Sequence, residues 1–373
     1  MKKLKLLTVV GTRPELIRLS ILIKKCDLYF DHVLVHTGQN YDFELNEIFF
    51  NDLQIRKPDY FLEVASNNLG DTLGNIISKS YKLFSRIKPD ALLVLGDTNS
   101  SLSVLSAKRL KIPIFHMEAG NRCFDQNVPE EINRKLADHI SDINLTYTEN
   151  SRRYLLSEGF RKDHVFSTGS PMFEVLNYFK TKIEKSDILK NLNINKKKYI
   201  VASIHREENI DIGNNFSNII KSLEDVVAKY NFPIVFSTHP RTKEKLKEIK
   251  INTRKKINFI KPLGFFDYVK LQKESFITLS DSGTISEESS IMNFPAVSIR
   301  TSTERPEAID FGTIVIGNID SKSILQSIFI SLETFAKGYN QIPDGYQINN
   351  SSDRVIKIIQ GYTKIINREI WKK

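Results

Sequence analysis

The chain of 373 residues is longer than one ordinary hydrophobic core supports, so two domains are expected. Its 40% hydrophobic and 26% charged residues are typical of a globular protein and exclude a disordered one. The net charge of +10 comes from basic residues spread along the chain, which disfavours nucleic acid and favours a phosphorylated small molecule as the partner.

The two cysteines and the lengths of the apolar runs narrow the possible classes of protein further. Cys26 and Cys123 form neither a disulfide framework nor a metal-ligand spacing, which fits a reducing compartment. No run approaches the roughly 20 apolar residues of a membrane helix. The apolar run Leu6–Val10 meets Gly-Thr-Arg-Pro, so it is predicted to be a first strand and not a signal peptide. We therefore expect a soluble, cytoplasmic protein with no membrane partner.

Strand-length apolar runs alternate with helical patterns through the first half of the chain. Strands are predicted at Leu4–Val10, Val33–His36, Ala91–Leu95, Ile112–Phe115, Ile143–Tyr147 and His164–Ser167. Helices are predicted at Pro14–Lys24 and, with an amphipathic stripe, at Asp71–Ile87. This β/α repeat is typical of a doubly wound parallel sheet, and it closes near Gly169.

A polar, Lys- and Asn-rich passage at 180–198 leads to a second β/α series. Its strands are predicted at Tyr199–Ile204, Pro233–Ser237, Ile257–Ile260, Phe276–Ser280 and Ala296–Ile299, with helices at Phe216–Tyr230 and from Asp353 onward. The sequence thus predicts an α/β fold of two Rossmann-like, doubly wound domains, 1–169 and 170–352, facing a central cleft. A C-terminal helix at 353–373 is expected to pack back on the first domain.

Acidic residues follow two successive strands of the first domain. Asp97 comes directly after Ala91–Leu95, and Glu118 follows the next predicted strand. Ligands of open α/β sheets bind at such strand ends. Glu130 opens a further helix nearby. Each acid alone would be a helix cap, but the three together form a candidate catalytic group.

The turn Gly11-Thr12-Arg13-Pro14-Glu15 follows the first strand and opens a helix. Free N–H groups at a helix start, together with Arg13, are suited to an anion. It is not a Walker motif, because no Gly-Lys-Ser/Thr follows. An ordinary β-turn-α with a surface arginine is the alternative.

Two histidines stand at strand ends in the second domain: His205 follows its first strand and His239 its second. Neither has a partner at a zinc-site spacing, so a metal is not expected. Each imidazole is suited to holding phosphate or transferring a proton.

The segment Ser280–Glu288 ends a strand, turns through small residues and starts a helix whose N–H groups face a phosphate. Glu288, one turn into the helix, is placed to hold a pair of sugar hydroxyls. Arg305 comes after the following strand and adds a second arginine for a diphosphate.

Eight motifs in order resemble one family along nearly the whole chain: GTRPE, TGQN, KPDALLVLGDT, HMEAGNR, PEEINR, HREEN, the DSG…EE turn and TERPEA. The sequence resembles the non-hydrolysing UDP-N-acetylglucosamine 2-epimerases, which have the two-domain glycosyltransferase-B fold. HREENID, GSPM and the terminal TKIINREIWKK resemble one branch. That branch makes UDP-N-acetyl-L-fucosamine from UDP-2-acetamido-2,6-dideoxy-L-talose for capsule or O-antigen synthesis.

The resemblance implies roles by matching position. The implied catalytic group is Asp97, Glu118, Glu130 and His205. The implied UDP-sugar ligands are Arg13, Arg18, Arg134, His239, Tyr268, Ser282, Gly283, Glu288 and Arg305, with Tyr268 near the uracil. Two residues depart from the family pattern: Arg18 replaces a lysine, and Thr284 replaces the second glycine of DSGG. A homodimer is expected from the resemblance alone.

The implied reaction is elimination and re-addition. A base removes the C2 proton while the nucleotide diphosphate leaves C1, and a 2-acetamidoglycal remains. A proton then returns on the other face, so the scheme needs acid/base groups on both faces and cations at the diphosphate. It needs neither a metal nor a redox cofactor.

Other readings stay open at this point. Within enzymes they are epimerisation of UDP-N-acetylglucosamine to the manno form, a hydrolysing variant, and a retaining glycosyltransferase of the same fold. A non-catalytic nucleotide-sugar binding protein is the alternative from a different class. It would need the diphosphate ligands and not the acids.

Overall fold

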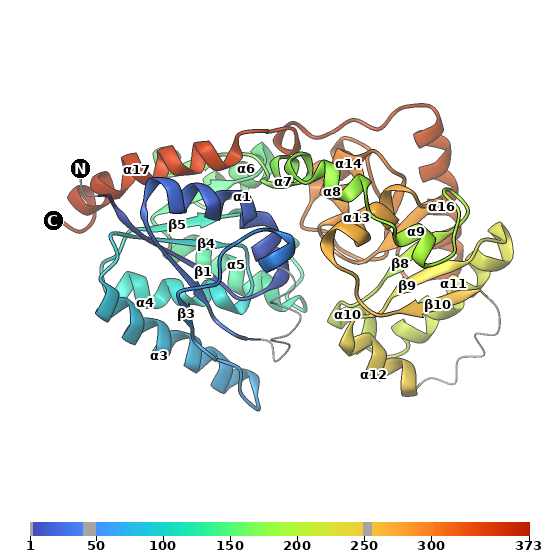
Figure 1. The fold of residues 1–373 in the computed structure, drawn as a ribbon, viewed down its shortest axis with the longest axis horizontal. Helices are drawn as coiled ribbons and strands as arrows, with labels where there is room; N and C mark the ends of the chain where they lie inside the picture. The colour runs from blue at the N-terminus through green and yellow to red at the C-terminus, as the bar shows by residue number, and fades with distance from the viewer. Residues whose placement is uncertain (1–2, 40–49, 249–255) are drawn as a thin grey trace. The chain divides into compact units, whose positions relative to one another are not determined.

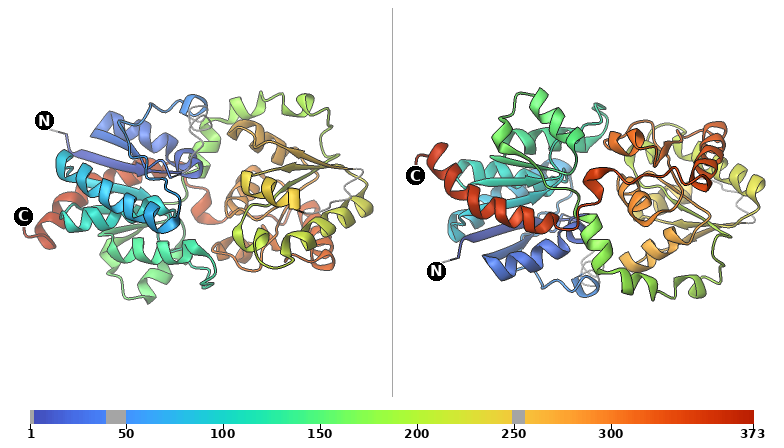
Figure 2. Two further views of the ribbon diagram at one scale, coloured as in Figure 1. Left: turned by 90° about the horizontal axis from the view of Figure 1, so that it is seen from below. Right: turned by 90° about the horizontal axis from the view of Figure 1, so that it is seen from above.

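The computed structural model describes residues 3–39, 50–248 and 256–373, which form two compact units (Figures 1 and 2). The first unit comprises Met1–Asn177 and Asp344–Lys373, and the second comprises Tyr178–Pro343. None of the helices in these described ranges is long and apolar enough to cross a membrane.

Within the described residues, the first unit holds a seven-stranded parallel sheet in the order β3-β2-β1-β4-β5-β6-β7. The strands are β1 Lys5–Val10, β2 Asp31–His36, β3 Tyr60–Phe61, β4 Ala91–Leu95, β5 Ile114–Met117, β6 Ile143–Thr146 and β7 Val165–Ser167. All residues of the central strands β4 and β5 are buried, as expected for strands covered on both faces. Their apolar runs therefore form the core of this unit.

Helices cover this sheet: α1 Arg13–Tyr29, α3 Leu69–Ile87, α4 Val104–Arg109, α5 Pro129–Ile140, α6 Glu149–Ser157, α7 Met172–Tyr178 and α17 Ser351–Glu369. The ends of α3 show how sequence sets their bounds. The Asn68 side chain accepts a hydrogen bond from the Asp71 N–H at the start, and Lys88 takes a left-handed conformation at the end. The periodic apolar face of α3 then packs Leu83 and Phe84 into the core.

The C-terminal helix α17 is part of the first unit and packs against α1 (Figure 1). Ser352 donates from its N–H and its hydroxyl to the Glu174 carboxylate, over 3.0 and 2.6 Å. Lys25 of α1 pairs with Glu174 and with Asp353. Because these contacts tie α7 and α17 to α1, the unit boundaries fall at 177 and 344 and not at 169 and 352 as the sequence predicted.

In the described part of the second unit, six parallel strands form a sheet in the order β10-β9-β8-β11-β12-β13. The strands are β8 Ile200–Ser203, β9 Ile234–Ser237, β10 Ile257–Ile260, β11 Ile277–Ser280, β12 Ala296–Ser298 and β13 Val315–Ile316. The helices are α8 Lys180–Glu184, α9 Ile188–Asn191, α10 Glu207–Ile210, α11 Asn215–Tyr230, α12 Pro240–Glu248, α13 Phe265–Lys273, α14 Ile285–Met292, α15 Pro306–Asp310 and α16 Ser321–Ala336. The core packs α11 and α16 against the buried strands.

Three features differ from the sequence prediction. The edge strands β3 and β13 were not predicted, since two residues each are too few to show a period. The passage 180–198, expected to be a polar connection, contains α8 and α9, which bury Ile183 and Ile188. In the sequence, only single apolar residues within this Lys-rich stretch indicated the two helices.

Candidate active site

Two acidic residues follow the neighbouring strands β4 and β5, whose ends are in register at Leu95 and Met117. Asp97 comes after Gly96 at the end of β4, and Glu118 comes directly after β5. A Cβ built on Gly96 would lie 3.5 Å from Glu118 Oε2, so the Glu118 carboxylate reaches the backbone beside Asp97. The structure thus brings together the two acids that the sequence placed at one sheet edge.

Arg134 of α5 holds the Asp97 carboxylate. Its Nε and Nη2 lie 3.0 and 2.7 Å from Asp97 Oδ2. Asn133 donates to the Asp97 carbonyl over 3.0 Å, so α5 fixes both the backbone and the side chain of this turn. Glu130 precedes Arg134 by four residues and therefore lies on the same face of α5.

The fully buried Glu131 fixes Arg134 in turn. Its carboxylate accepts from Arg134 Nη1 over 3.0 Å and from the backbone N–H groups of Cys123 and Phe124. These donors and the Arg134 charge lower the pKa of Glu131 against the opposing effect of burial, which is the largest single contribution. Glu131 therefore ties the loop after β5 to the helix that carries Arg134.

Three donors surround the Glu118 carboxylate. Arg18 Nη1 of α1 forms a short ion pair with Oε2, while Tyr147 Oη and Asn121 Nδ2 each lie 3.5 Å from one of its oxygens. The Glu118 backbone has a φ of +62°, a conformation that costs any residue with a Cβ. This backbone conformation directs the Glu118 carboxylate towards the carboxyl edge of the sheet.

A buried charged network lies beneath both acids. His116 Nε2 donates to the carbonyl of Gly96 over 2.8 Å, and its Nδ1 lies 2.9 Å from Asp138 Oδ1. The second Asp138 oxygen accepts from Arg122, which is 1% exposed. Burial lowers the pKa of His116, but the Asp138 carboxylate more than offsets this and the net shift is upward. The network joins the turn before Asp97 to the loop after Glu118.

The GTRPE turn is more closed than the sequence predicted. The Glu15 carboxylate accepts from the Gly11 N–H over 2.9 Å and from the Thr12 hydroxyl over 2.8 Å. Burial raises the pKa of Glu15 to about 7. A Cβ on Gly11 would lie 2.0 Å from Ser100 Oγ, so glycine is required there. The Gly11 amide is thus not free for an anion, and Arg13, the first residue of α1, remains the cationic group of this turn.

In the second unit, Asp281 organises the turn after β8. Its Oδ2 accepts from the N–H groups of His205 and Arg206 and from Asn209 Nδ2, over 2.8 to 3.1 Å. Its Oδ1 lies 3.2 Å from Nδ1 of His205, whose side chain is 36% exposed. The rings of His205 and the exposed His239 lie 5.8 Å apart, so the two predicted histidines are neighbours.

A second ion-pair network braces the Ser282 turn. Arg206 and Arg300 both pair with Glu304, over 3.3 and 2.6 Å. A Cβ on Gly283 would lie 2.3 Å from Glu304 Oε1, so only glycine lets Glu304 occupy this place. Gly283 therefore has a structural requirement as well as its predicted ligand role.

The remaining predicted residues lie along α13, α14 and the segment after β12. The hydroxyls of Ser282 and Thr284 are hydrogen-bonded to each other over 3.0 Å. Thr284, which replaces a glycine of the family pattern, therefore stabilises the turn that is predicted to bind phosphate. Glu288 Oε2 accepts from Gln272 over 2.9 Å, and burial followed by the Glu288 charge raises the pKa of Tyr268. Arg305 is buried with its Nη2 3.5 Å from Glu287.

The structure thus assembles two sets of predicted residues, each at the carboxyl edge of its own sheet. The first unit holds Arg13, Arg18, Asp97, Glu118, Glu130 and Arg134, and the second holds His205, His239, Tyr268, Ser282, Gly283, Glu288 and Arg305. Asn40 of the TGQN motif lies outside the described residues.

Sequence reasoning missed the residues that hold these side chains in place. Asp281 and Glu131 each adjoin a predicted residue, and their burial beside free N–H donors identifies them only in the structure. The available signal in the sequence was the acidic residue Asp281 directly before the Ser282-Gly283 turn. His116 and Asp138 gave none, because 21 other residues separate them in the sequence.

The chain is similar to known proteins along nearly its whole length. A family model described as UDP-N-acetylglucosamine 2-epimerase matches residues 24–360. A solved structure of UDP-N-acetylglucosamine 2-epimerase from Rickettsia bellii is 48% identical, covers 100% of both chains and has a TM-score of 0.93. The Methanocaldococcus jannaschii structure in complex with UDP-GlcNAc and UDP is 33% identical, with 96% of this chain and 99% of that one covered and a TM-score of 0.90.

A curated relative from Pseudomonas aeruginosa, a UDP-2,3-diacetamido-2,3-dideoxy-D-glucuronate 2-epimerase, is 31% identical over 93% of this chain and 98% of its own length. The relatives thus share 2-epimerisation and differ in the sugar. Two parallel sheets of Rossmann-like type, matching solved 2-epimerase structures of the glycosyltransferase-B type, confirm the predicted fold class. The chain therefore belongs to the UDP-N-acetylglucosamine 2-epimerase family, a family of isomerases.

Proposed function

We propose that the chain inverts C2 of a UDP-bound 2-acetamido sugar, converting UDP-2-acetamido-2,6-dideoxy-L-talose to UDP-N-acetyl-L-fucosamine. The observation that carries the proposal is the pair of strand-end carboxylates, Asp97 and Glu118, each held by its own guanidinium. Two fixed carboxylates at one sheet edge suit proton removal and return at a single carbon.

The reaction balances without an external oxidant or reductant. A base takes the C2 proton, the C2–H electron pair forms the C1–C2 double bond, and the C1–O bond breaks as UDP leaves with its electron pair. A proton then adds to the opposite face of C2, and a UDP oxygen re-forms the bond to C1. UDP and the base are both regenerated, so the net change is one inverted centre.

The first unit supplies the proton-transfer groups in this proposal. Asp97, Glu118 and Glu130 act at C2 from its two faces, and Arg134 and Arg18 orient the first two of them. Arg18 gives a planar, multiply donating partner to Glu118 where a lysine would give a point charge. Arg13, at the start of α1, is proposed to hold the diphosphate.

The second unit supplies the nucleotide ligands. His205, oriented by Asp281, is proposed to belong to the catalytic group together with the acids of the first unit. His239 is proposed to contact the leaving diphosphate, with the Ser282-Gly283 turn and Arg305 beside it. Glu288 is proposed to hold the ribose hydroxyls, with Tyr268 near the uracil. The M. jannaschii relative in complex with UDP-GlcNAc and UDP supports a nucleotide-sugar ligand for this fold.

The deoxy sugar is proposed from the HREENID, GSPM and terminal TKIINREIWKK motifs. The alternative substrate is UDP-N-acetylglucosamine, giving the manno epimer, and several relatives are named for a reaction on this sugar nucleotide. A role in capsule or O-antigen synthesis follows only for the first substrate. A homodimer stays a prediction, which sedimentation velocity tests.

Proton NMR in deuterated water tests the proposal, with each candidate sugar nucleotide in a separate tube. We expect deuterium at C2 of the L-talo compound together with formation of the L-fuco epimer. Exchange in UDP-N-acetylglucosamine alone moves the assignment to the gluco/manno pair. Exchange in neither, with UDP bound, leaves a nucleotide-sugar binding protein.

Two variants separate the enzyme from the binding protein. Asp97→Asn and Glu118→Gln keep the size of each side chain and remove its basicity. We expect each to lose C2 exchange by at least about 100-fold while UDP affinity stays within about threefold. Release of free sugar and UDP by the unaltered chain would instead indicate the hydrolysing reaction.

A further inference from the structure

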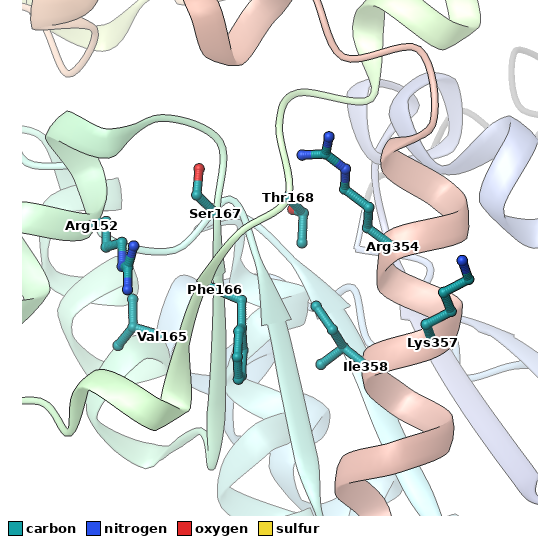
Figure 3. A pocket seen from close by; sticks show the side chains of 8 residues that line it. All are labelled: Arg152, Val165, Phe166, Ser167, Thr168, Arg354, Lys357 and Ile358. Atoms are coloured by element: carbon teal, nitrogen blue, oxygen red, sulfur yellow. The ribbon is translucent and has the colours of Figure 1, made fainter.

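A hollow of about 380 Å³ lies on the first unit, and neither Asp97 nor Glu118 is among the residues that line it (Figure 3). Its floor is apolar, with the Phe166 ring of β7 facing Ile358 of α17. Arg152 of α6 stands on one side, and Arg354 and Lys357 of α17 stand on the other. The lining therefore combines an apolar floor with three cationic side chains.

The acids nearby neutralise these cations only in part. The closest approach to Arg152 is Glu149 at 3.6 Å, and both of these side chains are partly or mostly exposed. Asp353, beside Arg354, pairs with Lys25 of α1. Arg354 uses its Nε on the neutral Asn350 side chain. The hollow thus keeps a net positive charge.

The positions of the cations are unfavourable for folding alone. Arg152 is the fourth residue of α6, and Arg354 is the fourth residue of α17. A helix dipole repels cations in the first turn. Lys357 follows Arg354 by three residues, so two like charges share one helix face. A bound anion would reverse all three repulsions.

The Arg152 guanidinium has donors to spare. Within the described residues, its Nε is shielded from solvent and has no hydrogen-bond partner, which costs free energy. A ligand in the hollow would meet the part of this side chain that is exposed. The Ser167 side chain at the end of β7 also lines the hollow, where its hydroxyl adds a neutral donor (Figure 3).

We propose that this hollow binds a small organic phosphate. The phosphate would lie among Arg152, Arg354 and Lys357, and the organic part would cover Phe166 and Ile358. The volume is at the lower end of known ligand pockets and suits a molecule of sugar-phosphate size. The proposal does not rest on the proposed reaction.

Isothermal titration calorimetry with glucose 1-phosphate, pyrophosphate and glucose tests the site. The titrations are run both with and without excess UDP, because UDP occupies the nucleotide site proposed above and is itself an organic phosphate. We expect one saturable glucose 1-phosphate site per chain, weaker pyrophosphate binding, no glucose binding, and affinity that falls as salt rises. Comparing glucose 1-phosphate with pyrophosphate tests the contribution of the apolar floor, and comparing glucose 1-phosphate with glucose tests the contribution of the cations.

The double variant Arg354→Gln/Lys357→Gln removes two exposed cations of the hollow. Its matched control is Lys364→Gln/Arg368→Gln, which makes the same charge change on the exposed surface of the same helix, outside the hollow. We expect at least a tenfold loss of glucose 1-phosphate affinity in the first variant and less than a twofold change in the second.

Equal affinity in the two variants, or the absence of saturable binding to the unaltered chain, would overturn the proposal. Pyrophosphate binding as tightly as glucose 1-phosphate would overturn the role of the apolar floor. Both variants change exposed side chains, so matching circular dichroism spectra and melting temperatures are expected. The readout is binding, so a failure here is distinct from a failure of the epimerase proposal.

Discussion

The Arg134 guanidinium bridges two carboxylates: its Nη2 lies 2.7 Å from Asp97 Oδ2, and its Nη1 lies 3.0 Å from Glu131 Oε2. Glu131 is buried and also binds the loop after β5. One side chain therefore sets the distance between the turn after β4 and the helix α5. Its fork of donors is what makes the bridge possible.

The Arg134→Lys variant tests this bridge. A lysine ammonium is a single point charge and does not reproduce the two directed contacts, so Asp97 is expected to lose its orientation. We expect kcat for C2 exchange to fall roughly 100-fold, a loss typical of one misplaced catalytic group. Arg153→Lys, the same change at an exposed arginine of α6, is the control and should keep kcat within about twofold. Full activity in Arg134→Lys would contradict the bridging role.

Glu118 offers a test of strain at the site. Its left-handed backbone favours glycine, so Glu118→Gly is expected to be more stable than Glu118→Ala by about 1 kcal/mol. Both variants lack the carboxylate and should show no C2 exchange. Chemical unfolding of the two variants under the same conditions measures the difference. Equal stability would mean that the surroundings, not the backbone preference, set this conformation.

The Asp138 network predicts a large loss of stability. Asp138→Asn removes the buried charge between His116 and Arg122, and we expect a loss of about 3 kcal/mol. Because the folded pKa of His116 is raised, its contribution is complete below the unfolded value of about 6.5 and is lost as pH rises through the folded value. Urea unfolding at pH 6 and pH 9 measures both effects.

The control for this network is His139→Gln, which changes a partly exposed histidine next to Asp138. It should leave stability within about 0.5 kcal/mol. A variant Asp138→Asn that keeps its stability and the pH slope of the unaltered chain would show that the network does not depend on this charge.

Glu15 gives a second pH dependence, with its own window. Its folded pKa of about 7 lies above the ordinary value of 4.5, so the folded state binds more protons between these values. Stability should therefore fall as pH rises from 4.5 to 7, by about 3 kcal/mol in total. Glu15→Gln should remove this slope. The fluorescence of Trp371, the sole tryptophan, follows unfolding of the unit that contains Glu15.

Much of the fold could be predicted because its signals are local. The central strands are continuous apolar runs, and the predicted Ala91–Leu95 and Ile257–Ile260 match β4 and β10. Others were off by one residue at an end, as with Ile143–Tyr147 against Ile143–Thr146, because apolar residues continue past the last ladder hydrogen bond. The prediction Ile112–Phe115 was displaced by two residues from β5 Ile114–Met117, because the polar His116 hid the second half of this strand. The edge strands β3 and β13 are defined by their pairing with β2 and β12, and two residues are too few to show an alternating apolar pattern.

The sequence by itself determined which residue types stand at the strand ends. Strand order places Asp97 and Glu118 at one edge of a parallel sheet, and the motifs carry the family resemblance. Only the tertiary structure decided the partners of these side chains. Arg18 reaches Glu118 from 100 residues away, and Glu15 takes the Gly11 amide that a free anion site would need. Partner choice depends on how each helix is rotated against the sheet, which core packing decides and local sequence does not record.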